Sequence, residues 1–212
     1  MKKEKKHLWI VAGLFAAFVL WTIAIRFVDV QGIGPRGSCV GFATMNGWFH
    51  SLTGVHMQLY TITDWLGLVP VGFGFGFALL GLLQWIERKN ILKVDRSILI
   101  LGGFYIVVLA AYLFFESYVV NYRPVLIAGC LEASYPSSTT LLTLCVMSTA
   151  ILQLYGRIKN RIFRNSVAGA IAVFTAFMVV GRLISGVHWI TDIIGGALLS
   201  AALVALYQSV AK

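Results

Sequence analysis

Charged residues are scarce in this chain. Only 12% of its 212 residues are charged and 59% are hydrophobic, whereas soluble domains average about 25% charged residues. So few charges cannot cover the surface of a water-soluble domain, and lipid must therefore be part of its solvent. The length suits one domain, so we expect a single membrane domain over residues 1–212.

Cysteine is scarce as well. The chain has three, Cys39, Cys130 and Cys145, and no CxxC pair. This small, odd set excludes a disulfide framework and gives no metal-binding spacing. Cys145 lies in an apolar run and is expected to pack in the interior. Cys39 and Cys130 are expected in loops on the same outer face. The sequence leaves open whether they form a disulfide bridge or stay free thiols.

The excess of positive charge does not indicate a nucleic-acid partner. The net charge is +9, but the basic residues stand in short clusters between long uncharged runs, which is the pattern of membrane topology. The clusters are Lys2, Lys3, Lys5 and Lys6; Arg88, Lys89, Lys93 and Arg96; Arg157, Lys159, Arg161 and Arg164; and Lys212.

Six uncharged runs are long enough to span a bilayer, which takes about 20 apolar residues. With six spans every basic cluster falls on one side of the membrane, so the positive-inside rule places both termini in the cytoplasm. We therefore predict an all-α, multi-pass protein of the cytoplasmic membrane. No small-residue cleavage site follows the first run, so we expect a retained helix rather than a signal peptide. The runs are 8–25, 65–86, 97–115, 137–155, 165–181 and 187–207.

The first outer segment, 26–64, contains an apolar pattern of its own. Phe42, Met45, Trp48, Phe49 and Leu52 have the spacing of a short amphipathic helix lying at the membrane interface. The sequence leaves open whether this helix merely caps the bundle or controls access of a substrate.

Ionisable and polar residues at the outer ends of the later spans form the candidate site, because ionisable residues at membrane depth are costly and usually functional. His188 and Asp192 are four residues apart, on one face of the expected helix. Asp192 can hold one imidazole nitrogen and leave the lone pair of the other free to attack. Arg123 and Arg182 are suited to phosphate oxygens. The pattern indicates phosphoryl transfer more than a structural ion-pair network.

The spacing of these residues resembles that of the type 2 phosphatidic acid phosphatases, relatives of the vanadium haloperoxidases. The family's third motif is Ser-Arg, five residues, His, three residues, Asp. Arg182, His188 and Asp192 match it, and Gly181 replaces the serine. The resemblance implies that His188 is the nucleophile, that Asp192 orients it and that Arg182 contacts phosphate.

The first two motifs match in part. Residues 136–139, Pro-Ser-Ser-Thr, stand where the family has Pro-Ser-Gly-His, so Thr139 replaces a histidine that protonates the leaving group. Arg123 precedes a proline as in the first motif, but Glu116 occupies the position of its lysine. The resemblance implies that Ser137 binds phosphate, and we assign the neighbouring Ser138 to the same phosphate-binding set as Arg123 and Arg182.

The resemblance also implies a fold and partners. It covers about residues 60–210, the phosphatase-like core, with the N-terminal helix and the amphipathic segment in residues 1–59. The family's six-helix layout agrees with the span count of the whole chain. It implies a lipid phosphate or diphosphate substrate. The predicted topology places the site on the outer membrane face, and the distribution of charge indicates no nucleic-acid partner. We expect no metal and no other cofactor, because the arginines neutralise the phosphate charge.

The departures from the motifs narrow the expected function. Threonine cannot act as a general acid near neutral pH, a loss that matters least when the leaving group is a phosphate. We therefore expect a preference for lipid diphosphates, such as a polyprenyl diphosphate, with His50, His56 and Glu116 as alternative proton donors. Glu116 could instead pair with Arg123 if their helix extends. That pairing would favour a non-catalytic lipid-binding or lipid-translocating protein on the same scaffold.

Overall fold

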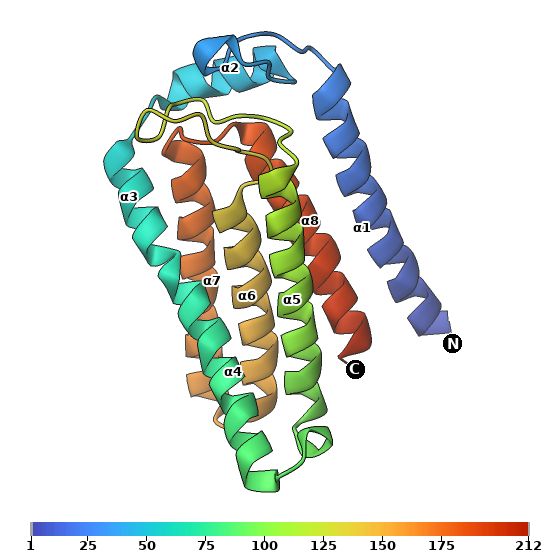
Figure 1. Cartoon of the computed structure of the whole chain (residues 1–212). Helices are drawn as coiled ribbons and strands as arrows, with labels where there is room; N and C mark the ends of the chain where they lie inside the picture. Colours follow the sequence, from blue (N-terminus) through green and yellow to red (C-terminus); the bar gives the residue numbers. More distant parts are fainter. Residues whose placement is uncertain (1, 212) are drawn as a thin grey trace.

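The computed structural model describes residues 2–211 as a helical bundle (Figure 1). Met1 and Lys212, the ends of the expected domain, lie outside this range. The described residues form no β-strand, only three isolated bridges in loops. The helices are α1 (Lys2–Phe27), α2 (Ala43–Thr53), α3 (Met57–Leu66), α4 (Leu68–Arg88), α5 (Arg96–Ser117), α6 (Ser138–Arg157), α7 (Arg161–Ile184) and α8 (Ile190–Val210), with 3-10 turns at Pro35–Gly37 and Ile91–Lys93.

Within residues 2–211, six stretches are long and apolar enough to cross a membrane, which confirms the predicted all-α fold and span count. The second stretch runs over Met57–Arg88 and is 32 residues long, because α3 and α4 follow one another with a break at Gly67. The sequence prediction began this span at residue 65, after Asp64. The structure extends it because Asp64 is paired with Arg182, 3.5 Å away, and so does not interrupt the helix.

The bundle has α6 at its centre. This helix packs against α7 and α8 and also contacts α4 and α5, while α1 packs along α8. The start of α1, the end of α8 and the α4–α5 connection lie toward one end of the bundle, and α2 lies across the opposite end (Figure 1). We call these the inner end and the outer end, following the predicted orientation in the membrane.

Helix α2 forms where the amphipathic segment was expected. Asp29 starts it: one carboxylate oxygen accepts a 2.7 Å hydrogen bond from the Thr44 backbone, which lowers the pKa of Asp29. The buried Asn46 ties α2 to the start of α8 through Thr191. Trp48 and Leu52 remain exposed, as an interfacial helix requires.

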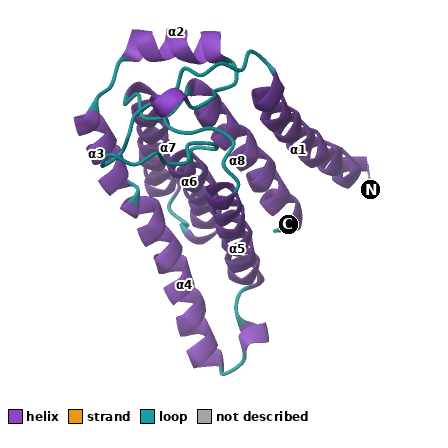
Figure 2. Ribbon diagram, turned by 45° about the horizontal axis from the view of Figure 1, so that its top comes forward, coloured by secondary structure: helices purple, strands orange, loops and turns teal. Residues whose placement is uncertain are grey.

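The α5–α6 connection folds back on itself over the outer end (Figure 2). The backbone N–H of Arg123 donates to the Glu132 carbonyl at 3.0 Å, and that of Ser134 donates to the Asn121 carbonyl at 2.9 Å. The pairing places residues 121–123 opposite residues 132–134. Trp189 Nε1, at the start of α8, donates to the carbonyl of Tyr122 in the same connection at 2.8 Å.

A polar network lies at the inner end, and we call it the inner cluster. Asp95 accepts hydrogen bonds from Gln84 at 2.8 Å, Arg88 at 3.1 Å and Arg157 at 3.4 Å. These hydrogen bonds lower the pKa of Asp95, and the bond from Gln84 has the largest effect. Arg157 also donates to Gln153, 3.0 Å away. The inner cluster joins α4, α5 and α6 through groups that satisfy one another.

The cysteines occupy the places expected from the sequence. Cys145 is buried. Cys39 and Cys130 are both exposed free thiols. Of the two alternatives, a disulfide bridge and two free thiols, the structure therefore has the two free thiols.

Candidate active site

A sharp turn between α7 and α8 carries His188. Gly186 has a φ of +68°, and a Cβ there would lie 1.9 Å from the Gly54 carbonyl oxygen, so glycine alone fits. Helix α8 begins at Ile190, later than the predicted residue 187. His188 therefore precedes the helix rather than sharing its face with Asp192, and its side chain is almost fully buried.

Asp192 is held at the start of α8 by several donors. One carboxylate oxygen, Oδ2, accepts the Trp189 backbone N–H at 2.9 Å, and the other, Oδ1, accepts from Asn121 at 3.3 Å. The carboxylate thus caps its own helix. The Ser137 N–H donates to the Asp192 backbone carbonyl at 3.1 Å, so this residue also positions the start of α6.

The hydroxyl of Ser134 lies between His188 and Asp192. Its oxygen is 3.0 Å from His188 Nδ1 and 2.5 Å from Asp192 Oδ2. The direct separation of Nδ1 and Oδ2 is 4.0 Å, beyond hydrogen-bond range. The expected contact between the histidine and the aspartate is therefore made through a serine.

Arg182 lies in the last turn of α7 and is 1% exposed. Its guanidinium sits over the Tyr60 ring, 4.7 Å from the centroid, and contacts Asp64 at 3.5 Å. Helix α3, which carries Tyr60 and Asp64, also explains the glycine at position 181. A Cβ on Gly181 would lie 2.8 Å from the methyl group of Thr63 in α3. The close approach of α3 leaves no room for the serine of the family motif.

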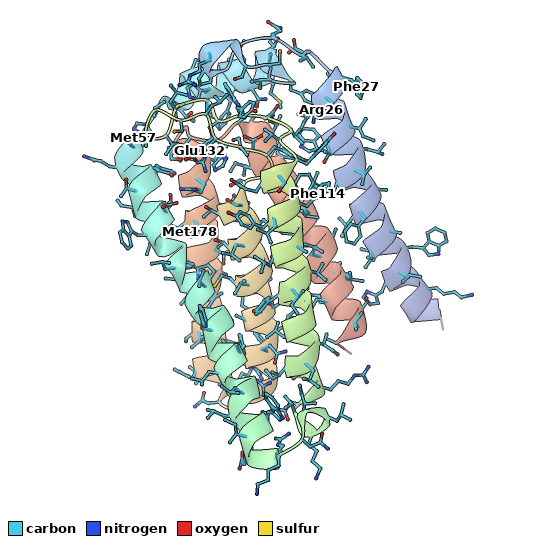
Figure 3. All side chains as sticks on the ribbon, in the orientation of Figure 1. Arg26, Phe27, Met57, Phe114, Glu132 and Met178 are labelled. Carbon is cyan, nitrogen blue, oxygen red and sulfur yellow. The ribbon has the colours of Figure 1, made fainter. Side chains whose placement is uncertain are left out.

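Arg123 pairs with a carboxylate that the sequence did not single out. Its Nε lies 3.1 Å from Glu132 Oε2, a charge contact without hydrogen-bond geometry. Helix α5 ends at Ser117, so it does not continue toward Arg123 as the considered pairing with Glu116 would require. Glu132 lies near the top of the molecule in Figure 3, and Arg123 also faces the Tyr60 ring at 5.8 Å.

Several buried nitrogens in this group make no hydrogen bond to any described residue: His188 Nε2, Arg182 Nε, and both Nε and Nη1 of Arg123. Buried polar groups are rarely left unpaired, because each costs about 1–3 kcal/mol. Arg123 and His188 line one small cavity of about 20 Å³ together with Glu116, Ser134 and Ser138. We call these residues, with Arg182 and Asp192, the outer site.

The electrostatics of the outer site keep His188 neutral. Burial lowers its pKa well below the usual value, and the positive charges of Arg123 and Arg182 lower it further. A neutral imidazole has one lone pair, and here the unpartnered nitrogen is Nε2. The site thus combines a neutral imidazole that has a free lone pair with two cations, an arrangement that suits attack on a phosphorus atom whose oxygens are negatively charged.

The second-motif residues are divided between two cavities. Ser137 is fully buried, and its oxygen accepts from the Thr140 hydroxyl at 3.0 Å at the start of α6. Ser138 lines both the small cavity and a larger apolar groove, whereas Thr139 lines the groove. Thr139 therefore does not take the place of a proton donor beside His188.

The apolar groove runs between α4, α5 and α6 and has a volume of about 610 Å³. Ala78, Leu109 and Leu142 are among the residues that line it, and Asp64 lies on its wall. Leu109 is more than half exposed on the lipid-facing surface. Since Ser138 lines both cavities, the groove lies next to the outer site.

Of the three alternative proton donors, Glu116 alone lines the small cavity. His50 lies 3.2 Å from the Gly186 carbonyl oxygen and packs against Trp189. His56 lies 2.9 Å from the Thr53 carbonyl oxygen. Both histidines are thus engaged with backbone oxygens around α2 rather than in the cavity.

The sequence reasoning missed Tyr60, Asp64, Asn121, Glu132 and Ser134. Asp64 could have been found, because it is the only charged residue between Arg36 and Glu87, and a lone charge in an apolar run is a functional signal. The other four are ordinary polar residues whose roles depend on how the loop and α3 meet α8. No local pattern marks them.

Comparisons with known proteins agree with the fold. The sequence model of the PAP2 superfamily matches residues 97–212. A solved structure, described as that of the first transmembrane PAP2 type phosphatidylglycerolphosphate phosphatase from Bacillus subtilis, resembles this chain with a TM-score of 0.60 and 17% sequence identity. The match covers 93% of this chain and 94% of the other. No curated protein sequence matches at the same stringency.

Proposed function

We propose that this chain, which belongs to the PAP2 superfamily, hydrolyses a lipid diphosphate at the outer face of the cytoplasmic membrane through a phosphohistidine intermediate. One observation carries the proposal. The buried Nε2 of His188 and buried guanidinium nitrogens of Arg123 and Arg182 have no hydrogen-bond partner among the described residues. A terminal phosphate would satisfy all of them.

The first chemical step is attack by His188. Its Nε2 lone pair forms a bond to the terminal phosphorus, the bond from phosphorus to the bridging oxygen breaks, and the lipid monophosphate leaves with that electron pair. Arg123 and Arg182 neutralise the charge on the phosphoryl oxygens. The first N–H groups of α6, around Ser138, add positive potential because helix N-termini leave them unpaired.

The second step regenerates the enzyme. Water attacks phosphorus, the N–P bond breaks, and its electron pair returns to His188 Nε2 while a proton passes to solvent. Inorganic phosphate is released. The nitrogen ends the cycle neutral, which matches the lowered pKa of His188.

The leaving group follows from Thr139 and Glu116. Thr139 lines the apolar groove rather than the cavity beside His188, so the family's general acid has no counterpart there. A phosphate leaving group needs little protonation, whereas an alkoxide needs a great deal. We therefore expect diphosphates to react faster than monophosphates, and Glu116 is the one carboxyl placed to assist.

The apolar groove supports a lipid tail. Its wall is formed by residues such as Ala78, Leu109 and Leu142, and burying each CH₂ of a chain there contributes about 0.8 kcal/mol. A long polyprenyl chain has many such groups, so we favour a polyprenyl diphosphate.

A second candidate has support of its own. Glu132 and Asp64 already pair with Arg123 and Arg182, and the cavity at His188 has room for only a water-sized guest. If these carboxylates were not displaced, the protein would bind or move a lipid without hydrolysing it. In the catalytic proposal, the substrate phosphate replaces Glu132 and Asp64 as the partner of each arginine.

The test is phosphate release by the purified full chain in detergent. The panel comprises a polyprenyl diphosphate, phosphatidic acid and phosphatidylglycerol phosphate, each with the wild type and His188→Ala. We expect release that is fastest on the diphosphate and absent in His188→Ala. Equal binding of lipid diphosphate by the wild type and His188→Ala, with no release from either, would favour the non-catalytic candidate. Resistance of the activity to EDTA would support a metal-free mechanism, and its abolition would refute one.

A further inference from the structure

The gap between His188 and Asp192 is filled by a hydroxyl group. The two side chains are 4.0 Å apart at their nearest nitrogen and oxygen, whereas Ser134 Oγ is within 3.0 Å of both. All three residues are buried: His188 and Ser134 are each 3% exposed, and Asp192 is 0% exposed. We infer that Ser134 is a positioning residue, through which the Asp192 carboxylate fixes the orientation and tautomer of His188.

The position of the hydrogens follows from simple counting. A serine hydroxyl has one proton, and Ser134 donates it to Asp192 Oδ2 at 2.5 Å. The remaining contact, at His188 Nδ1, can then be a hydrogen bond only if Nδ1 carries a proton and donates it to the serine oxygen. That tautomer leaves the lone pair on Nε2, the unpartnered nitrogen of His188, and His188 is one of the residues that line the small cavity.

Asp192 cannot easily take over the task directly. Its Oδ2 also accepts the Trp189 N–H and its Oδ1 accepts from Asn121, so both oxygens are tied in place. Turning the carboxylate toward His188 would break the cap of α8. The hydroxyl of Ser134 therefore bridges the distance between His188 and the carboxylate, which is held in place.

Ser134 is itself firmly placed. Its N–H donates to the Asn121 carbonyl at 2.9 Å. The next residue, Tyr135, is buried, with its hydroxyl 2.6 Å from Thr22 Oγ1 of α1. The Tyr135 ring packs on the α8 backbone so closely that a Cβ on Gly195 would lie 2.3 Å from it. These contacts of Ser134 and Tyr135 hold the backbone on both sides of the side chain, so the Ser134 hydroxyl keeps its position between His188 and Asp192.

The relay would matter most during attack. As Nε2 bonds to phosphorus the imidazole becomes positively charged, and its Nδ1–H donates more strongly. Ser134 passes this stabilisation to Asp192 by accepting from the ring and donating to the carboxylate. No proton needs to leave Nδ1, so the relay is electrostatic and orientational.

The inference can be tested apart from catalysis. The full chain is labelled with ¹⁵N-histidine, and the imidazole nitrogens of His188 are identified by their loss in His188→Ala. The ¹⁵N shifts report which nitrogen carries the proton. The Ser134 variants are Ala, Thr and Val, in which Thr and Val have the same shape and differ in the hydroxyl group.

We expect the wild type and Ser134→Thr to show a single tautomer with the proton on Nδ1, and Ser134→Ala and Ser134→Val to show a mixture. This part does not depend on the proposed function. A single Nδ1–H tautomer in Ser134→Ala or Ser134→Val, or a wild type protonated at Nε2, would overturn the inference.

The kinetic part rests on the proposed function. On the best diphosphate substrate, kcat of Ser134→Ala and Ser134→Val should fall about 10- to 100-fold, the typical cost of removing a group that orients a histidine. KM should stay unchanged, because phosphate binding is left to the arginines. Ser134→Thr should restore kcat. Equal kcat in Thr and Val variants would overturn the inference, whereas a wild type without activity but with the expected tautomers would refute only the proposed function.

Discussion

The two ends of the bundle carry polar networks that look alike in composition and differ in completeness. At the inner end, Asp95 accepts hydrogen bonds from Gln84, Arg88 and Arg157. At the outer end, His188 and Arg123 keep buried nitrogens without a hydrogen-bond partner among the described residues. The inner network is complete without a ligand, and the outer one is not.

In our proposal, this difference separates a structural network from a binding site. Both place charged side chains next to membrane-spanning helices, and burial or charge alone would mark both as functional. Unpaired buried nitrogens distinguish the outer site from the inner cluster, because a native fold rarely leaves such groups without a partner. We therefore expect changes at the outer end to alter activity and changes at the inner end to alter stability.

The largest expected effect contrasts two arginines. Arg123→Gln should lower kcat/KM about 10²- to 10³-fold, the usual cost of one donor to a developing charge. Arg157→Gln, in the inner cluster, should leave kcat/KM close to that of the wild type. Phosphate release at several substrate concentrations measures both. Equal losses in the two variants would remove the distinction between the two ends.

A second contrast tests whether the groove belongs to the outer site. Ala78→Trp fills the groove, and Leu79→Trp places the same side chain on the lipid-facing side of α4, where Leu79 is 55% exposed. Excluding two CH₂ groups of a lipid tail costs about 1.6 kcal/mol, or roughly a tenfold rise in KM. We expect this rise in Ala78→Trp with a long-chain substrate only. A rise in both variants, or with a short-chain diphosphate as well, would argue against a tail site.

A third contrast concerns how each end of the bundle affects the pH dependence of protein stability. The pKa of His188 is lowered from 6.5 in the folded protein, so below pH 6.5 the unfolded chain binds a proton that the folded one does not. Stability should then decrease as pH falls below 6.5, by at most about 1.4 kcal/mol per pH unit. The pKa of Asp95 is lowered from 3.8, so its contribution should be lost only below that pH.

Thermal unfolding between pH 7 and pH 3 measures both windows. His188→Gln should flatten the decrease that begins at pH 6.5 and leave the one below pH 4, and Asp95→Asn should do the opposite. If His188→Gln left the upper window unchanged, a neutral buried His188 would be excluded.

The smallest effect concerns Asp95 at neutral pH. Asp95→Asn weakens partly exposed ion pairs with Arg88 and Arg157, which are worth about 1 kcal/mol or less. We expect a slightly lower unfolding temperature and unchanged kcat/KM. A loss of activity larger than the loss of stability would show that the inner cluster is coupled to the chemistry.

The sequence predicts the frame of the molecule well, because its signals are local. Uncharged runs and basic clusters predict six spans, and the described part of the chain has six helical stretches that could cross a membrane. The spacing of Arg182, His188 and Asp192 identifies the family that the sequence model confirms. Each of these signals can be read within about 20 residues.

The details of the outer site depend on contacts between distant segments, which the sequence does not show. Ser134 meets His188 because the α5–α6 connection folds back and places it opposite Asn121. Gly181 makes sense only once Thr63 of α3 is seen against it. The start of α8 was placed too early, because Asp192 caps the helix at the Trp189 N–H and leaves His188 outside it.

The most direct test of the central claim is to trap the phosphorylated enzyme. The full chain is mixed for milliseconds with a polyprenyl diphosphate labelled with ³²P in its terminal phosphate, then quenched in alkali, where a phosphohistidine survives. Our account predicts an acid-labile, alkali-stable label on the wild type, none on His188→Ala, and decay at the rate of phosphate release. Release of labelled phosphate by the wild type without any such intermediate on the rapid time scale, or undiminished label and turnover in His188→Ala, would contradict it.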